Sequence, residues 1–359
     1  MKKILAIVHD PGGARALAPV LLALHEDNIF NVVTMAGPFA RTVLAEDRMK
    51  PMSALTDISM TMASRILENE RPDVLLTATS WNSNLEQQFR NAARQQSVPS
   101  VVVVDFWNNA LLRWKGADYP LEKLTDIICV MDENFKRHME ARGFPKEALH
   151  VTGQPHLERL TNLKGPVPAA RHETPTTFLF LSQPSDVLQF KTTGGHPLEI
   201  FLEALETYAR SAGLPCQVTV KAHPKERAED SRGIVEAFLE NSHLRVVLAQ
   251  DTTSLVDQYR AHDVVAGYYT MGLFEARILG RRVLSLDVAV TDPSVTQALG
   301  EYGIGVVDWP AMDSLAGLLR RPSNPFIEDK NQGAARAVVA LIKKCPMRDQ
   351  EHEESIFNR

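Results

Sequence analysis

Short, uninterrupted runs of hydrophobic residues alternate with amphipathic segments along most of the chain. In the first half the apolar runs predict buried strands at Ile4–Val8, Asn31–Met35, Val74–Leu76, Ser100–Val104, Ile127–Val130 and His150–Thr152. Between them, apolar residues at helical spacing predict helices at Ala14–His25, Ser59–Glu68, Ser83–Gln95 and Glu133–Arg142. Apolar strands separated by amphipathic helices are typical of a parallel sheet covered on both faces.

The second half repeats this pattern. It predicts strands at Thr177–Leu181, Gln217–Ala222, Arg245–Leu248, Asp263–Val265 and Arg282–Leu286. The predicted helices are Pro197–Ala212, Gly233–Glu240, Ser254–Arg260 and Gly272–Leu279. Residues 164–175 hold three prolines and no periodicity, as is typical of a linker.

These patterns predict an α/β protein with two Rossmann-like, doubly wound domains, at residues 1–163 and 176–331. A length of 359 residues suits two domains. A final helix is expected within 332–346, where packing back on the first domain is one option, and a flexible tail at 347–359. Ligands of such sheets bind beyond the carboxyl ends of the strands, and we expect the two domains to face one central cleft.

Composition narrows the classes of function. A formal net charge of −5 gives no reason to expect a nucleic-acid partner. The three cysteines lie far apart and lack metal-ligand spacing, which indicates a reducing compartment and no metal site. No stretch approaches the roughly 20 apolar residues of a membrane span, and the first apolar run is too short for an export signal. We expect a cytoplasmic protein, with peripheral membrane contact left open.

The first candidate motif runs from His9 to Gly13, directly after a predicted strand and before a predicted helix. Gly12 and Gly13 would let the backbone approach an anion at the helix N-terminus. Asp10, or as second choices His9 or Asp105, stands where a general base would stand. The alternative is a tight turn in which Asp10 caps the helix.

The second motif is Lys221-Ala222-His223-Pro224, at the end of a predicted strand. Alternation along the strand puts Lys221 and His223 on one side of the sheet, near its carboxyl edge. There they can bind a phosphate through charge-assisted hydrogen bonds. The alternative is a structural histidine at a strand exit.

Two further strand exits of the second half carry candidate donor-binding residues. Thr270 and Gly272 would offer a hydroxyl and a backbone N–H to phosphate at a helix start. Glu275 would accept hydrogen bonds from a ribose diol or cap that helix. Ser182 opens a polar loop that is either a phosphate contact or plain surface.

In the first half, Asp105, Trp107 and Asn108 follow the strand Ser100–Val104. An aromatic ring beside an acid and an amide suits a sugar acceptor, because rings stack on sugar faces. The alternative is an aromatic cluster in the core beneath a loop.

With these motifs assembled, the chain resembles the GT-B superfamily, which comprises glycosyltransferases and UDP-GlcNAc 2-epimerases, over roughly Lys3 to Lys344. Gly12 and Gly13 match its glycine pair facing the donor, and Val151–Pro155 resembles its interdomain crossing. Lys221–Pro224 resembles the His-Pro motif of bacterial capsule sialyl-, Kdo- and glycerophosphotransferases, in which the histidine contacts the donor phosphate. The glutamate pair of retaining enzymes is missing, since residue 267 is glycine.

The resemblance implies a metal-independent glycosyltransferase of surface-polysaccharide or glycoconjugate synthesis that needs no cofactor. Asp10 and His223 would be catalytic. The nucleotide-sugar donor would bind the second domain through Ser182, Lys221, Thr270, Gly272 and Glu275. Gly12 and Gly13 of the first domain would also contact this donor. A glycan or lipid-linked acceptor would bind Asp105, Trp107 and Asn108. The alternatives are an epimerase-like isomerase or hydrolase, and a non-catalytic nucleotide-sugar binder.

Overall fold

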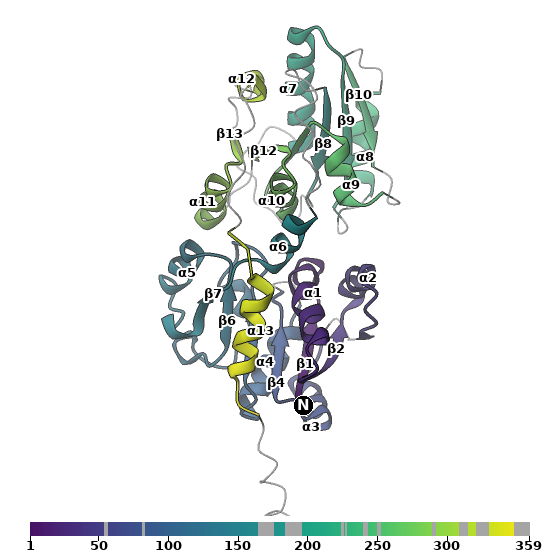
Figure 1. Cartoon of the computed structure of the whole chain (residues 1–359). Helices are drawn as coiled ribbons and strands as arrows, with labels where there is room; N and C mark the ends of the chain where they lie inside the picture. The colour runs from purple at the N-terminus through teal and green to yellow at the C-terminus, as the bar shows by residue number, and fades with distance from the viewer. Residues whose placement is uncertain are drawn as a thin grey trace, which may run out of the picture. The chain divides into compact units, whose positions relative to one another are not determined.

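The computed structural model describes residues 1–53, 57–80, 83–163, 176–183, 196–223, 226, 228–239, 243–249, 253–288, 292–308, 315–320 and 330–347. The chain divides into two compact units (Figure 1). The first unit comprises Met1–Arg159 and Asp329–Arg359, and the second comprises Leu160–Glu328. The predicted linker at 164–175 and nearly all of the predicted tail lie outside the described residues.

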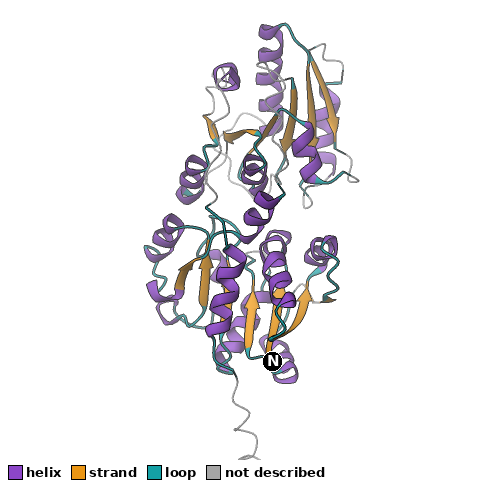
Figure 2. Ribbon diagram, viewed as in Figure 1, coloured by secondary structure: helices purple, strands orange, loops and turns teal. Residues whose placement is uncertain are grey.

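The first unit contains a parallel sheet of seven strands in the order β3-β2-β1-β4-β5-β6-β7. The strands are β1 Lys2–Val8, β2 Phe30–Ala36, β3 Met52–Ser53, β4 Val74–Thr77, β5 Ser100–Val103, β6 Ile127–Val130 and β7 Leu149–Val151. The helices are α1 Pro11–Glu26, α2 Pro38–Glu46, α3 Met60–Glu70, α4 Leu85–Gln95, α5 Glu133–Glu140 and α13 Ala334–Lys344. Helix α6, Pro155–Asn162, begins in this unit and ends in the second. Helices therefore lie on both faces of the sheet (Figure 2).

Alternation along the central strand β1 divides the core of the first unit into two layers. Ile4, Ala6 and Val8 pack in one cluster with residues of α1, α2 and α13. Leu5 and Ile7 point to the opposite face, into a cluster with residues of α3 and α4. A strand buried on both faces is apolar throughout, which is the pattern visible in the sequence.

The second unit contains a parallel sheet of six strands in the order β10-β9-β8-β11-β12-β13. The strands are β8 Thr177–Leu181, β9 Cys216–Lys221, β10 Leu244–Leu248, β11 Val264–Gly267, β12 Arg282–Asp287 and β13 Gly305–Asp308. The helices are α7 Pro197–Ala212, α8 Ala228–Ala237, α9 Leu255–Ala261, α10 Met271–Ile278, α11 Pro293–Glu301 and α12 Leu315–Arg320. The core of one face is aromatic, and the rings of Phe180 and Phe201 lie 5.0 Å apart.

The predicted fold class of two Rossmann-like parallel sheets is confirmed, and each predicted strand is present. The sequence prediction omitted β3, β13, α2, α6, α11 and α12. β3 has only two residues, too few for any periodicity. Helix α6 begins at Pro155, which the sequence suggested as part of a turn, although proline also suits the first position of a helix.

Helix α13 belongs to the core of the first unit although it lies far from the rest of that unit in sequence. Val338 and Ile342 are fully buried and pack with residues of α1 (Figure 1). Glu158 of α6 accepts hydrogen bonds at the start of α13, from the N–H of Gly333 at 2.6 Å and that of Ala335 at 2.9 Å. A carboxylate is favoured there by the free N–H groups and the helix dipole.

The other end of α13 is bound by Lys2 of β1. The Lys2 ammonium donates to the carbonyl oxygens of Ile342, Lys343 and Cys345 at 3.2, 2.9 and 2.5 Å. The Ile342 carbonyl also accepts from the Cys345 N–H at 3.3 Å. The last carbonyls of a helix lack the usual intrahelical partners, so a cation there adds hydrogen bonds and complements the helix dipole.

Replacing Lys2 with methionine therefore tests whether this contact stabilises the unit. We expect the free energy of unfolding to fall by about 1–2 kcal/mol, the usual cost of losing a hydrogen-bonded charge at a partly buried helix end. Chemical denaturation would measure it. The control is Lys3→Met, which removes a partly exposed ion pair to Glu70 at 3.0 Å and should cost less than about 1 kcal/mol. Equal losses in the two variants would contradict the proposed anchoring by Lys2.

Candidate functional site

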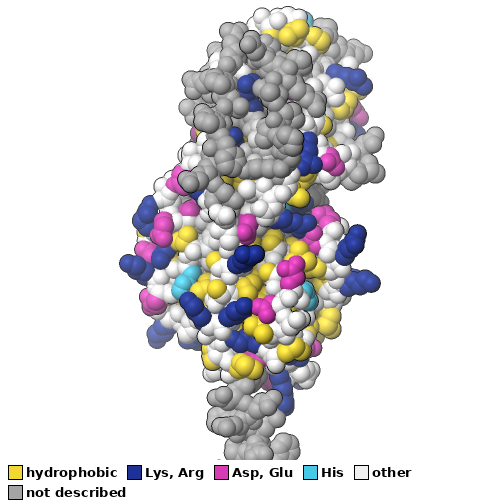
Figure 3. Space-filling model, in the orientation of Figure 1, with side chains coloured by type: hydrophobic (Ala, Val, Ile, Leu, Met, Phe, Trp, Pro, Cys, Tyr) yellow, Lys and Arg dark blue, Asp and Glu magenta, His cyan; other side chains and the backbone are white. Residues whose placement is uncertain are grey.

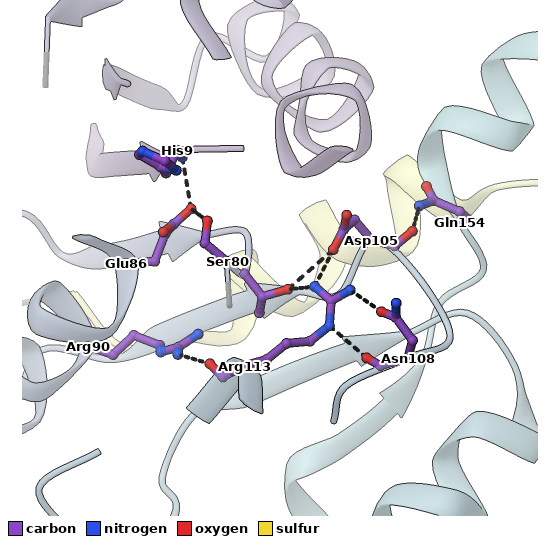
Figure 4. Close-up of polar contacts among 9 residues, drawn as sticks. His9, Ser80, Glu86, Arg90, Asp105, Asn108, Arg113 and Gln154 are labelled. Atoms are coloured by element: carbon purple, nitrogen blue, oxygen red, sulfur yellow. Dashed lines mark hydrogen bonds and ion pairs between the residues drawn. The ribbon is translucent and has the colours of Figure 1, made fainter. Parts of the chain in front are cut away.

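The polar residues of the first unit gather at the carboxyl edge of its sheet. Strands β1, β4 and β5 are neighbours, and each one leads into polar residues at its carboxyl end. His9 and Asp10 follow β1, Thr79 and Ser80 follow β4, and Asp105 follows β5. Because parallel strands end at the same edge, side chains far apart in the sequence come together (Figure 4).

An ion pair between Asp105 and Arg113 lies at the centre of this group. Arg113 Nη1 is 2.5 Å from Asp105 Oδ1, and the two side chains are 4% and 15% exposed. The same nitrogen donates to Thr79 Oγ1 at 2.5 Å, and Thr79 in turn donates to Asp105 Oδ1 at 3.3 Å. One carboxylate oxygen of Asp105 is therefore held by two donors (Figure 4).

The second oxygen of Asp105 faces the start of α1. A Cβ atom at Gly12 would collide with Asp105 Oδ2, so glycine is the residue that lets this carboxylate approach the helix. A negative charge is stabilised at a helix N-terminus. Gly13 has a different task, since a Cβ there would lie 2.5 Å from the Cβ of Ala78. The predicted contact of this glycine pair with a donor phosphate stays a prediction.

A second cluster lies beside it, formed by His9, Asp10 and Glu86. His9 Nδ1 lies 3.1 Å from Asp10 Oδ1. Asp10 occupies the N-cap position of α1, but its side chain makes no capping hydrogen bond. Glu86 Oε1 accepts from the backbone N–H of His9 at 2.8 Å and from the Ser80 hydroxyl at 3.0 Å (Figure 4). The capping role considered for Asp10 is therefore not what its side chain does.

Glu86 is a buried carboxyl group that sequence reasoning missed. Its side chain comes from the first turn of α4, and the residue is only 1% exposed. Burial raises the pKa of Glu86, and the negative charge of Asp10 raises it further. A glutamate in the first turn of a helix is usually an exposed capping residue, so the sequence carried no signal of this burial.

Trp107 and Asn108, the predicted acceptor-binding residues beside Asp105, form hydrogen bonds within the first unit. Trp107 is 1% exposed, and its indole N–H donates to Asp132 Oδ2 at 2.5 Å. Asn108 accepts from Arg113 twice, through its side-chain oxygen at 2.8 Å and its backbone carbonyl at 2.9 Å. The ring of Trp107 is therefore part of the core, which is the alternative that the sequence had left open.

At the carboxyl edge of the second sheet, Ser182, Lys221 and His223 lie on the neighbouring strand exits of β8 and β9. Leu181 pairs with Lys221, and the N–H of Ser182 donates to the Lys221 carbonyl at 2.9 Å. Glu226 connects them: it accepts from the Ser182 hydroxyl at 3.0 Å and from the His223 N–H at 3.1 Å. The Ser231 hydroxyl also donates to it. Glu226 lies only three residues beyond His223, but its role was not predicted from the sequence.

The remaining candidates lie at the exit of β11, which pairs with β8. The hydroxyl of Thr270 accepts from the Gly272 N–H at 3.3 Å and so caps α10. A Cβ at Gly272 would lie 2.6 Å from Leu181 Cδ1 and 2.8 Å from the Tyr259 hydroxyl, so this glycine is required for packing. Glu275 is 4% exposed and accepts from Tyr259 at 2.8 Å. The structure thus brings the predicted donor residues of the second half to one sheet edge.

Two other expectations concern metals and membranes. Among the described residues, no cluster of three or more His, Cys, Asp or Glu side chains is placed to hold a metal ion. No helix in that part of the chain is long and apolar enough to cross a bilayer. On the face shown in Figure 3, basic and acidic side chains of the described residues are intermixed over the first unit, which differs from the continuous basic surface of nucleic-acid-binding proteins.

Solved structures with the same fold cover nearly the whole chain. S. aureus MnaA, solved with UDP, matches with a TM-score of 0.69 and 18% identity over 96% of each chain. The UDP-GlcNAc 2-epimerase of Neisseria meningitidis, bound to UDP-GlcNAc, matches with a TM-score of 0.67 and 15% identity over 95% of this chain and 100% of its own. MurG of Acinetobacter baumannii matches with a TM-score of 0.60 and 13% identity over 96% of this chain and 100% of its own.

These likenesses establish the fold class: the chain has a two-domain GT-B fold. They support the epimerase-like part of the resemblance suggested by the sequence and give no support to its sialyl- and Kdo-transferase part. No protein-family model matches the chain. No curated protein matches it either.

The contact between Gly12 and Asp105 can be tested by a double-mutant cycle. Gly12→Ala forces the Asp105 carboxylate to move, and we expect a loss of about 1–3 kcal/mol in the free energy of unfolding, as for other overpacking changes. In an Asp105→Ala background the clash is absent, so the same substitution should cost much less. Urea denaturation of the four proteins measures the coupling. An equal cost of Gly12→Ala in both backgrounds would show that the carboxylate does not occupy this position.

The raised pKa of Glu86 makes a prediction about pH. A carboxyl that stays protonated in the fold stabilises it fully below its ordinary pKa of 4.5, and this contribution is lost as pH rises through the raised value. The slope is at most about 1.4 kcal/mol per pH unit. Glu86→Gln keeps a neutral acceptor, so its stability relative to wild type should increase with pH over this range.

The matched control for Glu86 is Glu70→Gln, because Glu70 forms only a partly exposed pair with Lys3. Its stability relative to wild type should not follow the Glu86→Gln trend above pH 4.5. Thermal unfolding at pH values from 5 to about 9 compares the proteins. A difference between Glu86→Gln and wild type that does not change with pH would mean that Glu86 is ionised in the folded protein.

Proposed function

We propose that this protein is an enzyme that binds a UDP-sugar and alters the sugar without passing it to a second acceptor, as an epimerase-like isomerase or hydrolase does. The substrate class is supported by three neighbours with this fold whose structures contain UDP or UDP-GlcNAc. Epimerases also match the chain with higher TM-scores than MurG does.

The observation that carries the proposal is the acid–base set at the carboxyl edge of the first sheet. Inverting a carbon centre that carries hydrogen requires one group to remove a proton and another to return one. Asp105, with one oxygen held by Arg113, suits the base, and the His9–Asp10 pair suits the partner. Such sites typically hold carboxyl groups whose pKa values differ because their surroundings differ. The raised pKa of Glu86 fits this pattern.

The predicted acceptor-binding residues already form hydrogen bonds within the first unit, which favours a reaction without a second sugar. A glycosyltransferase needs a surface for a second sugar, and Trp107 was the ring expected to supply it. That ring is 1% exposed and hydrogen-bonded to Asp132. The ring of Trp107 is therefore buried within the first unit, and Asn108 binds Arg113, the ion-pair partner of Asp105.

For the nucleotide, the proposal assigns the carboxyl edge of the second sheet. Lys221 is the last residue of β9, His223 follows that strand, and the N-terminus of α10 follows β11. Such fixed positive and N–H groups stabilise a diphosphate, and they would keep it in place while the sugar reacts. This edge is shaped by the capping and packing contacts of Thr270, Gly272 and Glu275. Contacts of Ser182 or Glu275 with the nucleotide stay predictions.

Glycosyl transfer to a surface-polysaccharide or glycoconjugate acceptor is the second candidate. It is favoured by the match to MurG, a glycosyltransferase, over 96% of this chain. In that case the base would be Asp10 or Asp105, and the acceptor would bind elsewhere than on the ring of Trp107.

The test is to incubate the protein with UDP-GlcNAc alone in deuterated water and to follow the sugar by NMR. We expect a new UDP-sugar or a free sugar, with deuterium at the inverted carbon, because the returning proton comes from solvent. Asp105→Asn should lower kcat by at least about 100-fold, the usual value of a general base. Glu122→Gln, an exposed acid of the first unit before β6, is the control and should leave kcat unchanged.

Three outcomes separate the candidates. Conversion of UDP-GlcNAc without acceptor supports the proposal. Turnover that appears only when glycan or lipid-linked acceptors are added supports glycosyl transfer instead. A rise in melting temperature with UDP but no turnover under either condition would indicate a nucleotide-sugar-binding protein.

A further inference from the structure

We propose that Arg113 is the positioning residue that sets the orientation of the Asp105 carboxylate, and that the polar face of α4 exists to hold Arg113 in place. The inference rests on the proposed function, in which Asp105 moves a proton. It concerns residues that lie behind the candidate base.

All three nitrogen atoms of the Arg113 guanidinium group form hydrogen bonds within the first unit. Nη1 contacts Asp105 Oδ1 and Thr79 Oγ1, Nη2 donates to the Asn108 side chain, and Nε donates to the Asn108 carbonyl. A planar fork held at three nitrogens has one orientation only. It binds a single oxygen of Asp105 and leaves Oδ2 beside Gly12 as the oxygen able to accept a proton.

Helix α4 holds the segment that carries Arg113. Arg90 Nη2 donates to the Arg113 carbonyl at 2.8 Å, Asn91 donates to the Gly116 carbonyl at 2.9 Å, and Gln95 donates to Asp118 at 3.1 Å. The Arg90 guanidinium also lies 4.9 Å from the centre of the Trp114 ring. Three side chains of one helix thus bind the segment 113–118, and Figure 4 shows the bond from Arg90 to Arg113.

Burying the Arg90 guanidinium lowers the stability of the fold, which indicates that this side chain has a role other than stabilisation. Arg90 is 1% exposed, and its Nε and Nη1 have no hydrogen-bond partner in the described part of the chain. Burying a charge with donors unsatisfied is unfavourable, and an apolar side chain of similar size would stabilise a core better. Retaining a guanidinium is understandable if the exact position of the Arg113 backbone matters for the chemistry of Asp105.

The expected consequence is a loss of turnover with little change in binding. Arg113→Lys keeps the positive charge but loses the fork, so Asp105 can rotate. Misplacing a reacting group by about 1 Å typically costs a factor of about 100. We expect kcat to fall about 10- to 100-fold in Arg113→Lys, with KM for UDP-GlcNAc within about twofold of wild type.

Variants on α4 complete the experiment. Arg90→Lys removes the bond to the Arg113 carbonyl and should lower kcat in the same way. Asn91→Ala removes the bond to the Gly116 carbonyl and the bond that Asn91 accepts from Gln87, but leaves the bond to Arg113, so it should have a smaller effect of the same kind. Arg94→Lys is the matched control, because Arg94 stacks on Tyr119 at 4.3 Å and makes no contact with the 113–116 backbone that the structure shows. It should leave kcat unchanged.

The readings distinguish this inference from the proposed function. If wild type converts UDP-GlcNAc and Arg113→Lys has a lower melting temperature but the kcat of wild type, Arg113 is merely structural and the inference is wrong. A loss confined to KM would also overturn it. If wild type itself converts no UDP-sugar, the proposed function fails and the positioning role fails with it. A kcat loss in Arg113→Lys, Arg90→Lys and Asn91→Ala, with Arg94→Lys normal, supports the inference.

Discussion

The parallel arrangement of the strands is the constraint on which the rest of the structure depends. Each strand must return to the start of the next through a crossover segment, in most cases a helix, so all strands of a unit end at one edge. Apolar residues fill both faces of the sheet, and polar residues are left at the strand exits. Residues separated by almost a hundred positions, such as His9 and Asp105, therefore share one edge without any direct pairing between them.

Carboxylates of the protein itself occupy two of the places where the sequence suggested phosphate. Asp105 lies against Gly12 at the start of α1, and Glu226 takes the hydrogen bonds of Ser182 and the His223 N–H. Both positions satisfy the same rule that attracts phosphate, namely that free N–H and hydroxyl donors favour an anion. A donor-rich strand exit therefore identifies an anion position, and it does not say whether the anion is a ligand or a side chain.

Much of the fold was predictable because its signal is local, whereas the roles of the site residues depend on partners distant in sequence. The run Ile4–Val8 can only be a buried strand, and the structure confirms it. The sequence suggested that the ring of Trp107 stacks on a sugar, because it does not show Asp132 beside the indole nitrogen. Glu86 and Arg90 resemble surface residues of a polar helix, and only the packing of α4 on the sheet makes them buried. Which residues lie at a strand exit can be predicted, but which contacts they make there cannot.

The return of α13 to the first unit has a consequence for how the chain acquires its structure during synthesis. Residues of the second unit form one continuous segment, so that unit can fold as soon as it leaves the ribosome. The first unit begins earlier but lacks Val338 and Ile342 from its core, and Lys2 has no helix end to bind, until the last of these residues has been made. During translation the apolar surface of α1 that α13 later covers therefore stays exposed to solvent until α13 has been made.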